Sequence, residues 1–450
     1  MRLRKKTALL LAFTALMPII SPVKAKGLEQ IDHIVVIYLE NRSFDNLFGA
    51  FPQAEGLAQA KKAPLQVDEY GRPYAALPPV FSGEQPDTRF PLDLANAPFD
   101  IADYVSPDQK HPDLTHRFFI HQMQINAGRN DRFAQLSSAG ALTMGHYDVS
   151  GSALWQYAKE FTLADNFFQA TFGGSFLNHH WLICACTPAF KEAPIELRHW
   201  KNDPNTGKPM SDPAVTQDGY VVNTMQPFNP PFDDTKHKPR LPVQYHATIG
   251  DRLTEKGISW AWYAGGWDDA IAQRKTEGNF QYHHQPFVYY ANYAPGSQGR
   301  AAHLKDKSQL LSDLAGTFPH VAFYKPIGSN NQHPGYATLQ DADQDVKEVV
   351  EAIRSSAIWP RTAIIITYDE FGGFWDHVAP PVIDRWGPGT RIPAIIVSPL
   401  AKKGYVDHTQ YDTTSILKFI ETRFDLEPLS DRDAKAKDLS NAFNIAPDPL

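Results

Sequence analysis

Short, continuous apolar runs recur along the chain and are separated by segments with a different periodicity. They lie at 33–39, 258–263, 321–324, 363–367 and 392–397. Uninterrupted apolar runs of this length are typical of strands that are covered on both faces, as in a parallel sheet. We therefore expect them to form a central sheet.

Two segments that follow these runs have apolar residues at helical spacing, over 345–355 and 412–424. Each segment gathers its apolar residues on one face, and Asp412 or Thr413 fits the N-cap of the second helix. Strands that alternate with such helices predict an α/β fold, a three-layer α/β/α sandwich with a mostly parallel central sheet. The residues of the two faces are Val346, Val349, Val350, Ile353, Ile416, Leu417, Ile420 and Phe424.

Proline is concentrated in two parts of the chain. Of 36 prolines, ten lie in 52–112 and ten in 188–242, which predicts two long irregular excursions from the core. Long loops in a compact domain often build or cover a site, and simple surface decoration is an equal alternative.

The first 25 residues have the order of a secretory signal peptide. Arg2, Arg4, Lys5 and Lys6 precede an apolar stretch over 8–20, and Val23-Lys24-Ala25 offers a small-residue cleavage site. A membrane anchor is disfavoured because a spanning helix needs about 20 apolar residues. We expect a bacterial exported protein, periplasmic or secreted, whose residues 26–450 form a single catalytic domain.

The charge balance narrows the class of partner. The formal net charge is −7, and cleavage after Ala25 would remove five basic residues and no acidic one, which gives −12. A surface this acidic argues against a nucleic-acid partner, since it offers no basic face for phosphates. No other segment is apolar enough to cross a bilayer, so we expect no integral membrane segment after cleavage.

Polar clusters follow two of the predicted strands directly. Glu40 and Asn41 come after 33–39, and Asp369 and Glu370 come after 363–367. Strand C-terminal ends line the active crevice of an open parallel sheet. Carboxylate and amide oxygens are hard ligands for a divalent cation, and adjacent buried carboxylates repel unless a cation lies between them. A helix-capping loop or an acidic turn is the alternative for each cluster alone.

A serine follows two glycines in Phe172-Gly173-Gly174-Ser175, ahead of a possible helix. Ser175 could be an exposed nucleophile, because a helix N-terminus favours a bound anion. The same triplet is also common in linkers. Among 17 histidines, His116, His283, His284 and His333 are candidates for contacting phosphoryl oxygens or protonating a leaving group.

The segment from His33 to Gly49, His-Ile-Val-Val-Ile-Tyr-Leu-Glu-Asn-Arg-Ser-Phe-Asp-Asn-Leu-Phe-Gly, resembles the opening signature of the bacterial phosphoesterase family. That family contains secreted phospholipases C and acid phosphatases and belongs to the alkaline-phosphatase-like superfamily. Further segments match in order, so the resemblance covers most of the mature chain. They are 172–180, 283–287, 333–336, 366–380 and 409–424.

The resemblance implies an alkaline-phosphatase-like fold and a role for each candidate. A divalent metal ion, which could be Zn, Ca, Mg or Mn, would be bound by Glu40, Asn41, Ser175, Asp369 and Glu370. Ser175 would attack phosphorus and form a phosphoserine that water hydrolyses. His116, His283, His284 and His333 would stabilise the phosphoryl oxygens and protonate the leaving oxygen.

Some positions depart from the family pattern or have a weaker assignment. Family members often carry two aspartates where this chain has Asp369 and Glu370, so Glu370 adds one methylene to the ligand set. Asp376, His377 and His408 could form a second metal site, as in the wider superfamily, or support the first.

We expect an exported, metal-dependent phosphoric ester hydrolase similar to the acid phosphatases, with a phosphomonoester substrate. The alternative is a phospholipase C that cleaves phospholipid head groups and makes transient contact with a membrane surface. The chain is shorter than the large hemolytic phospholipases that it resembles, which favours the phosphomonoester. A non-catalytic exported binding protein is a minor alternative, which Ser175 and the ligand set disfavour.

The two cysteines, Cys184 and Cys186, are too close in sequence for an ordinary structural bridge, so we expect buried helix cysteines and no disulfide framework. Cys186-Thr-Pro begins like the sulfatase sequence Cys-x-Pro-x-Arg that yields formylglycine. Phe190 stands where that sequence has its arginine, which disfavours a sulfatase.

Overall fold

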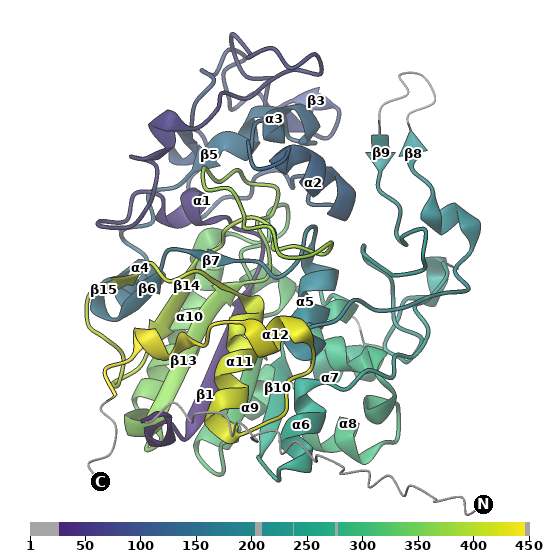
Figure 1. Ribbon diagram of the computed structural model, residues 1–450, viewed down its shortest axis with the longest axis vertical. Coiled ribbons are helices and arrows are strands. Elements are labelled where there is room, and N and C mark those ends of the chain that lie inside the picture. The colour runs from purple at the N-terminus through teal and green to yellow at the C-terminus, as the bar shows by residue number, and fades with distance from the viewer. Residues whose placement is uncertain (1–26, 203–208, 237, 275–277, 446–450) are drawn as a thin grey trace, which may run out of the picture.

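The computed structural model describes residues 27–202, 209–236, 238–274 and 278–445. Its centre is an eight-stranded sheet in the order β11-β10-β12-β1-β13-β14-β6-β15 (Figure 1). Seven of these strands run parallel, and only β14 is antiparallel to both of its neighbours. This confirms the mostly parallel central sheet. The strands are β1 (His33–Leu39), β6 (Thr162–Ala164), β10 (Trp260–Ala264), β11 (Leu304–Lys305), β12 (Val321–Lys325), β13 (Thr362–Tyr368), β14 (Ala394–Val397) and β15 (Tyr405–Asp407).

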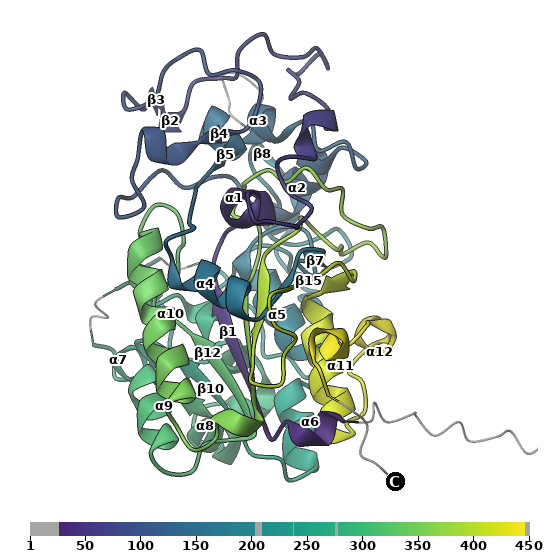
Figure 2. The same cartoon turned by 90° about the vertical axis from the view of Figure 1, so that its left-hand side faces the viewer.

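Helices cover both faces of this sheet, which confirms the predicted α/β/α sandwich. Figure 2 shows α10, α9 and α4 on one side of the sheet and α5, α11 and α12 on the other. The helices of the two layers are α4 (Ala153–Glu160), α5 (Ser175–Cys184), α6 (Ile249–Glu255), α8 (Gln298–His303), α9 (Lys307–Leu314), α10 (Leu339–Arg354), α11 (Thr413–Phe424) and α12 (Asp431–Lys435).

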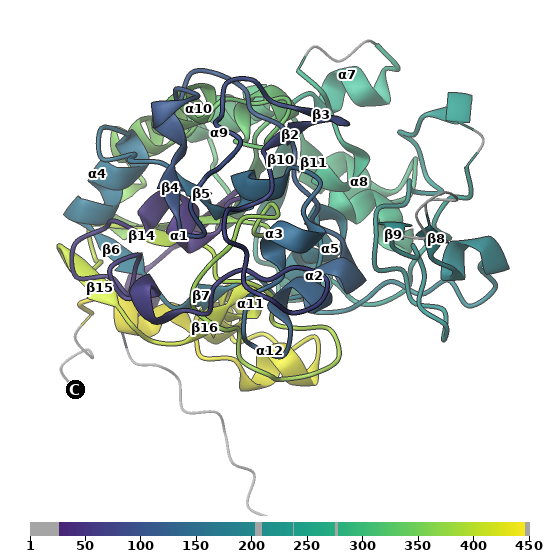
Figure 3. The same ribbon diagram turned by 90° about the horizontal axis from the view of Figure 1, so that it is seen from above.

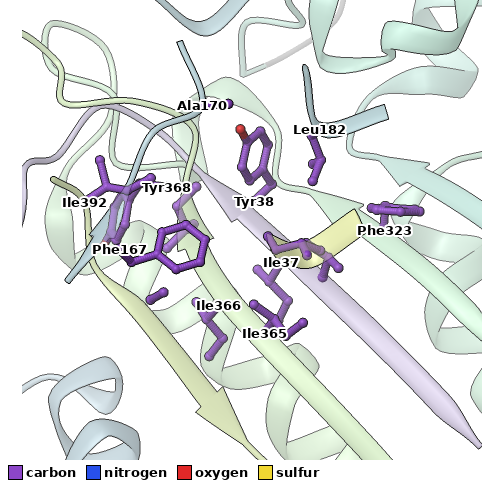
Figure 4. Close-up of a cluster of buried hydrophobic side chains, with 14 of the residues drawn as sticks. Ile37, Tyr38, Phe167, Ala170, Leu182, Phe323, Ile365, Ile366, Tyr368 and Ile392 are labelled. Atoms are coloured by element: carbon purple, nitrogen blue, oxygen red, sulfur yellow. The ribbon is translucent and has the colours of Figure 1, made fainter. Parts of the chain in front are cut away.

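The sheet forms because its central strands are buried on both faces, as their continuous apolar sequences predict. All seven residues of β13 are buried, and so are the six residues of β1 after His33. Figure 4 shows Ile37 and Tyr38 of β1 beside Ile365 and Ile366 of β13, within one cluster of buried apolar side chains.

Several predicted boundaries differ from the observed ones by one or two residues, as for the run at 258–263, which forms a strand over Trp260–Ala264. The strand predicted over 392–397 begins at Ala394 rather than at Ile392, because Pro393 has no N–H to donate to the ladder. The helix predicted over 345–355 begins at Leu339, where the Thr338 side chain caps it by accepting from the backbone N–H of Asp341 at 3.0 Å. Asp412 is the N-cap of α11, as its sequence predicts.

Short elements lie over the carboxyl ends of the strands, where α1 and α2 sit above the sheet in Figures 1 and 3. The two proline-rich excursions contribute only strands of two or three residues and short 3₁₀ turns within the described ranges. The remaining elements are α1 (Phe44–Phe48), α2 (Phe118–Ile125), α3 (Phe133–Leu136), α7 (Trp267–Ile271), β2 (Phe81–Ser82), β3 (Gln85–Pro86), β4 (Phe99–Asp100), β5 (Gly145–His146), β7 (Phe167–Phe168), β8 (Lys201–Asn202), β9 (Pro209–Ser211) and β16 (Tyr411–Asp412).

The predicted signal peptide, residues 1–25, lies outside the described residues. None of the helices in the described ranges combines the length and the apolar character that a bilayer crossing requires.

Candidate active site

The ends of three neighbouring strands bring the polar residues together. Strand β1 lies between β12 and β13, with Leu39 opposite Tyr368, so Glu40 and Asn41 meet Asp369 at one edge of the sheet. The backbone N–H of Asn41 donates to Oδ1 of Asp369 at 3.1 Å. The two clusters that follow separate strands in the sequence therefore form one buried group in the structure.

The turn after β13 needs a glycine at 372. Gly372 has a φ of 64°, and a Cβ atom there would lie 2.2 Å from the carbonyl oxygen of Asn41. Asn41 itself has a φ of 66°, a left-handed conformation that asparagine tolerates better than most residues. The close approach of these two turns fixes the backbone around the carboxylates.

Ser175 is the first residue of α5 and lies at the same edge. Its hydroxyl donates to Oδ1 of Asn41 at 3.4 Å, and the side chain is buried with 7% of its surface exposed. Gly173, at a φ of 84°, allows this turn to pass within contact distance of Phe118, where a Cβ atom would lie 2.7 Å from the Phe118 Cα. The structure thus places the predicted nucleophile beside the predicted metal ligands.

The four predicted histidines line the same group. Nε2 of His284 contacts Oε1 of Glu40. Nε2 of His333 lies 4.0 Å from Oε2 of Glu40, and Nε2 of His116 lies 3.8 Å from Oε1 of Glu370. The ring of His283 is 4.8 Å from that of His284. All the residues predicted for the site are therefore brought together.

Three further residues of this group received no role from the sequence. Nζ of Lys325 lies 2.8 Å from Oε1 of Glu40, and the Tyr336 hydroxyl donates to Oε2 of Glu40 at 3.1 Å. Nδ1 of His179 lies 3.8 Å from Oδ2 of Asp369. Lys325 has a sequence signal, a charged residue at the end of a fully apolar strand, whereas His179 and Tyr336 lie within the matched motifs without being distinguished by them.

The pKa values of the three buried carboxyls of the site shift in opposite directions. Burial and the nearby Glu40 raise the pKa of Asp369 to about 7, and burial followed by the charge of Asp369 raises the pKa of Glu370 well above its usual value. Burial alone would also raise the pKa of Glu40, but His284 and Lys325 together hold it well below the usual range. Of these three carboxyls, Glu40 is the one that has a lysine ammonium within 4 Å among the described residues.

Burial favours the neutral form of four histidines in this group. Burial lowers the pKa of His284 to about 4 and lowers the pKa of His116, His179 and His283 from their ordinary value. A neutral imidazole keeps a lone pair for a metal or for a hydrogen bond from a donor.

Several buried polar atoms at the site have no hydrogen-bond partner, which is the pattern expected of ligands to an ion. They include Oδ2 of Asp369, Oε1 of Glu370 and Nε2 of His179. The residues present therefore fit a divalent cation. Within the described ranges, the triads with ligand atoms within 4.8 Å of one another are Glu40–His283–His284, Glu40–His179–Asp369, Asp113–His116–His333 and Asp45–Asp376–His377.

Glu370 is absent from these four triads of the described residues. Its Oε2 accepts from the backbone N–H of Gly372 at 2.6 Å, and its Oε1 faces His116. The longer side chain thus turns toward the glycine turn and the histidine rather than toward Asp369.

Asp376 and His377 belong to a separate buried network with Asp45 and Arg391. Nδ1 of His377 lies 2.6 Å from Oδ2 of Asp45, and the guanidinium of Arg391 lies 3.1 Å from both Asp45 and Asp376. The guanidinium of Arg391 stands between the two carboxylates, and Asp45, Asp376 and His377 also form one of the four triads above, so support of the first site and a second metal site both stay predictions. His408 is exposed and pairs with Asp165 at 2.8 Å.

The prediction that Cys184 and Cys186 are unbridged is wrong. The two residues form a disulfide. Helix α5 ends at Cys184, and Ala185 adopts a left-handed conformation with a φ of 46°, which brings the Cα atoms of the two cysteines to 5.1 Å. The sequence rule assumed a continuous helix or strand, and the reversal at Ala185 removes that assumption. A bridged Cys186 also gives no support to a sulfatase.

A group of carboxylates, imidazoles and a serine at a helix N-terminus, placed at the carboxyl edge of a parallel sheet, is typical of a hydrolase that works on an anionic ester. The comparison of the sequence with known families agrees with this class. Residues 31–427 match the Phosphoesterase family, and the chain belongs to that family, which makes it a phosphoric ester hydrolase.

Curated relatives of the chain carry the name phospholipase C. The chain is 25% identical to a non-hemolytic phospholipase C of Burkholderia pseudomallei, over 93% of this chain and 60% of that protein. It is 25% identical to phospholipase C A of Mycobacterium tuberculosis, over 94% of this chain and 79% of that protein. A non-specific phospholipase C6 of Arabidopsis thaliana is 36% identical over 28% of this chain and 29% of that protein. The chain thus spans only 60% of the length of the Burkholderia relative.

The solved structures that the chain matches include a protein in the alkaline phosphatase superfamily from Vibrio parahaemolyticus. That structure is 9% identical, covers 70% of this chain and 67% of its own, and has a TM-score of 0.31. A phosphonate monoester hydrolase from Silicibacter pomeroyi is 11% identical over 66% of this chain and 72% of its own, with a TM-score of 0.34.

Proposed function

We propose that the chain hydrolyses phosphoric esters by nucleophilic attack of the Ser175 oxygen on phosphorus. The observation that carries the proposal is the position of this hydroxyl, at the N-terminus of α5 and 3.4 Å from Oδ1 of Asn41, beside the buried carboxylates. Attack would form the Ser175–phosphorus bond and break the bond from phosphorus to the alcohol oxygen. Water would then release phosphate or a phosphomonoester from the phosphoserine.

Glu40, Asn41 and Asp369 would hold a divalent cation together with the Ser175 oxygen, with Glu370 as a further candidate. Such an ion, when bound, lowers the pKa of the serine hydroxyl and neutralises charge on a phosphoryl oxygen. The N-terminal N–H groups of α5 orient the anionic ester in front of Ser175. His116 and His333, whose rings are 5.7 Å apart, are placed to hold the proton for the leaving oxygen.

The nucleophile assignment is tested with Ser175→Ala, which removes the attacking oxygen and leaves the backbone of α5 unchanged. We expect turnover of p-nitrophenyl phosphate or of a soluble phosphodiester to fall by about 10³-fold or more. An acid-quenched reaction of the unmodified protein should contain a peptide phosphorylated at Ser175. Ser297→Ala, which changes the N-cap of the remote helix α8, is the matched control and should retain activity. Full activity of Ser175→Ala would contradict the assignment.

For the substrate, we favour a phospholipid over a soluble phosphomonoester. The support for a phospholipid is that the relatives compared above are phospholipases C, whereas the support for a phosphomonoester is the acidity of the predicted mature chain. Release of a phosphorylated head group from phosphatidylcholine vesicles, measured against hydrolysis of p-nitrophenyl phosphate, separates the two. Activity on p-nitrophenyl phosphate alone would establish the acid-phosphatase-like alternative.

We also propose that the chain is exported and cleaved near Ala25, and that residues 26–450 form one catalytic domain. The support for one domain is a single cluster of buried apolar residues that extends from Leu28 to Phe443. N-terminal sequencing of the protein recovered from the periplasm or the medium tests the cleavage site.

A further inference from the structure

The loop between β13 and β14 exposes an apolar tip, which we define as Pro381, Val382 and Ile383. Val382 is fully exposed at 100%, and Ile383 is exposed at 50%. No charged residue occurs from Val378 to Ile383. Two neighbouring β-branched aliphatic side chains, one fully and one half exposed, keep apolar surface in water, which suggests that another phase covers them.

The tip is suited to burial in a lipid interface because few of its polar groups would lose water. Pro380 and Pro381 have no backbone N–H, so two donors that would need partners in lipid are missing. The charged residues that follow the tip are already paired. Asp384 accepts from Arg432 at 2.8 Å, and Arg385 donates to Asp218 at 2.8 and 2.9 Å.

The base of the loop is joined rigidly to the turn that carries the nucleophile. The backbone N–H of Phe172 donates to the carbonyl of Trp386 at 2.7 Å. The Trp386 ring packs 6.1 Å from that of Phe118 and 5.3 Å from that of Tyr220. Phe172 lies three residues before Ser175, so the tip is held in a fixed position relative to the active site.

The other end of the loop is equally well anchored. The side chain of Asn130 donates to the carbonyl oxygens of Asp376 at 2.9 Å and of Val378 at 3.1 Å. The loop therefore rises from the sheet toward α2 between two fixed ends (Figures 1 and 2). A rigid, apolar projection beside the site would bring Ser175 to a surface in one orientation.

We propose that this tip inserts into the interface of a phospholipid bilayer and positions the active site over its substrate. The proposal rests on the phospholipid substrate proposed above. A bilayer fits the tip better than a protein partner does, because the tip has no charged residue and the charged residues that follow it, Asp384 and Arg385, are already paired.

The test compares the double variant Val382→Asp/Ile383→Asp with the unmodified protein in sedimentation with phosphatidylcholine vesicles. We expect the variant to bind vesicles about tenfold more weakly or worse, since two buried aliphatic groups are replaced by charges. Hydrolysis of the vesicles should fall in parallel. Turnover of soluble p-nitrophenylphosphorylcholine should stay unchanged, because neither residue belongs to the site.

The matched control is Leu65→Asp/Leu92→Asp, which places the same charges at two exposed leucines of the 52–112 excursion. These residues are 53% and 64% exposed, and the control should bind vesicles normally. Vesicle binding by the tip variant equal to that of the unmodified protein would overturn the proposal. Light scattering is the second measurement. If the unmodified protein is a dimer and the tip variant is a monomer, the bilayer proposal is overturned and the tip contacts a second copy of this chain. If the unmodified protein binds vesicles but cleaves no ester, the proposed function fails and the docking surface stands.

Discussion

The ammonium nitrogen of Lys325 lies 2.8 Å from Oε1 of Glu40, and both side chains are buried. Lys325 is the last residue of β12, and Glu40 directly follows β1. The parallel pairing of these two strands therefore brings the two side chains together. The lysine charge keeps Glu40 ionised where burial alone would protonate it. Among the described residues, Asp369 and Glu370 have no lysine or arginine at such a distance, so the proposed divalent cation would balance their charge.

Replacing Lys325 by Met should therefore leave Glu40 as a buried carboxylate without its cationic partner. We expect the free energy of unfolding to fall by about 3–5 kcal/mol, the cost of breaking a buried ion pair from one side. Urea unfolding of the metal-free protein measures this change. Lys305→Met is the control, because its partly exposed pair with Asp313 should contribute about 1 kcal/mol or less. Equal stability of Lys325→Met and the unmodified protein would show that the pair does not stabilise the fold.

Gly372→Ala should disrupt the turn that aligns the two strand ends. The new Cβ atom would lie 2.2 Å from the Asn41 carbonyl oxygen, so the backbone must shift and the hydrogen bond from Asn41 to Asp369 should be lost. We expect loss of metal binding, measured by elemental analysis, together with loss of turnover. Gly257→Ala is matched in backbone conformation, with a φ of 69° and no atom within 4 Å of the new Cβ. It should cost only about 1–2 kcal/mol of stability and should leave the site intact.

Removal of the metal should expose the repulsion among the buried carboxylates. After dialysis against a chelator we expect turnover to be lost and the melting temperature to fall, because a ligand that binds only the folded state stabilises it. Addition of Zn, Ca, Mg or Mn in turn should identify the ion that restores both measurements. The Asp369→Asn variant lacks the negative charge of one predicted metal ligand, so its melting temperature should change much less when the chelator is added. An unchanged melting temperature of the unmodified protein after complete metal removal would contradict the proposed site.

Glu421 should make the stability of the fold depend on pH without involving the active site. Burial, followed by the neighbouring Asp433, raises the pKa of Glu421 to about 9. Because the folded protein holds this proton more tightly than the unfolded chain does, stability is greatest below the unfolded pKa of about 4.5. Stability should decrease as the pH rises toward 9.

Glu421→Gln removes this dependence. At pH 8 we expect the variant to be more stable than the unmodified protein by a few kcal/mol, on the order of 1.4 kcal/mol for each pH unit above the unfolded pKa. At pH 4.5 the two should differ little. Thermal or urea unfolding across this range measures the effect, and Glu427→Gln, at an exposed position, is the control without it. A difference between variant and parent that does not change with pH would refute the assignment.

Much of the fold follows from local sequence. The apolar runs at 33–39 and 363–367 could only be stable as strands covered on both faces, and Asp412 marks the start of its helix by the capping chemistry of its side chain. The start of α10 is harder to predict from the sequence, because Leu339 and Ala342 belong to its buried face but precede the clearest apolar spacing. The antiparallel direction of β14 has no local signal, since a buried apolar strand pairs in either direction.

The candidate site likewise has features that the sequence predicts and features that depend on the tertiary structure. The sequence by itself predicted candidate metal ligands and a candidate nucleophile, because carboxylates, an amide and a serine stand at the ends of apolar strands and helices and match the motifs of the family that the chain resembles. Only the tertiary structure decided that Lys325 and His179 join them, that Glu370 turns toward His116, and that Cys184 and Cys186 are bridged. The physical reason is that each of these contacts depends on distance in space or on one backbone reversal. Strand order and a single left-handed residue determine them, and neither is encoded in the spacing of residues along the chain.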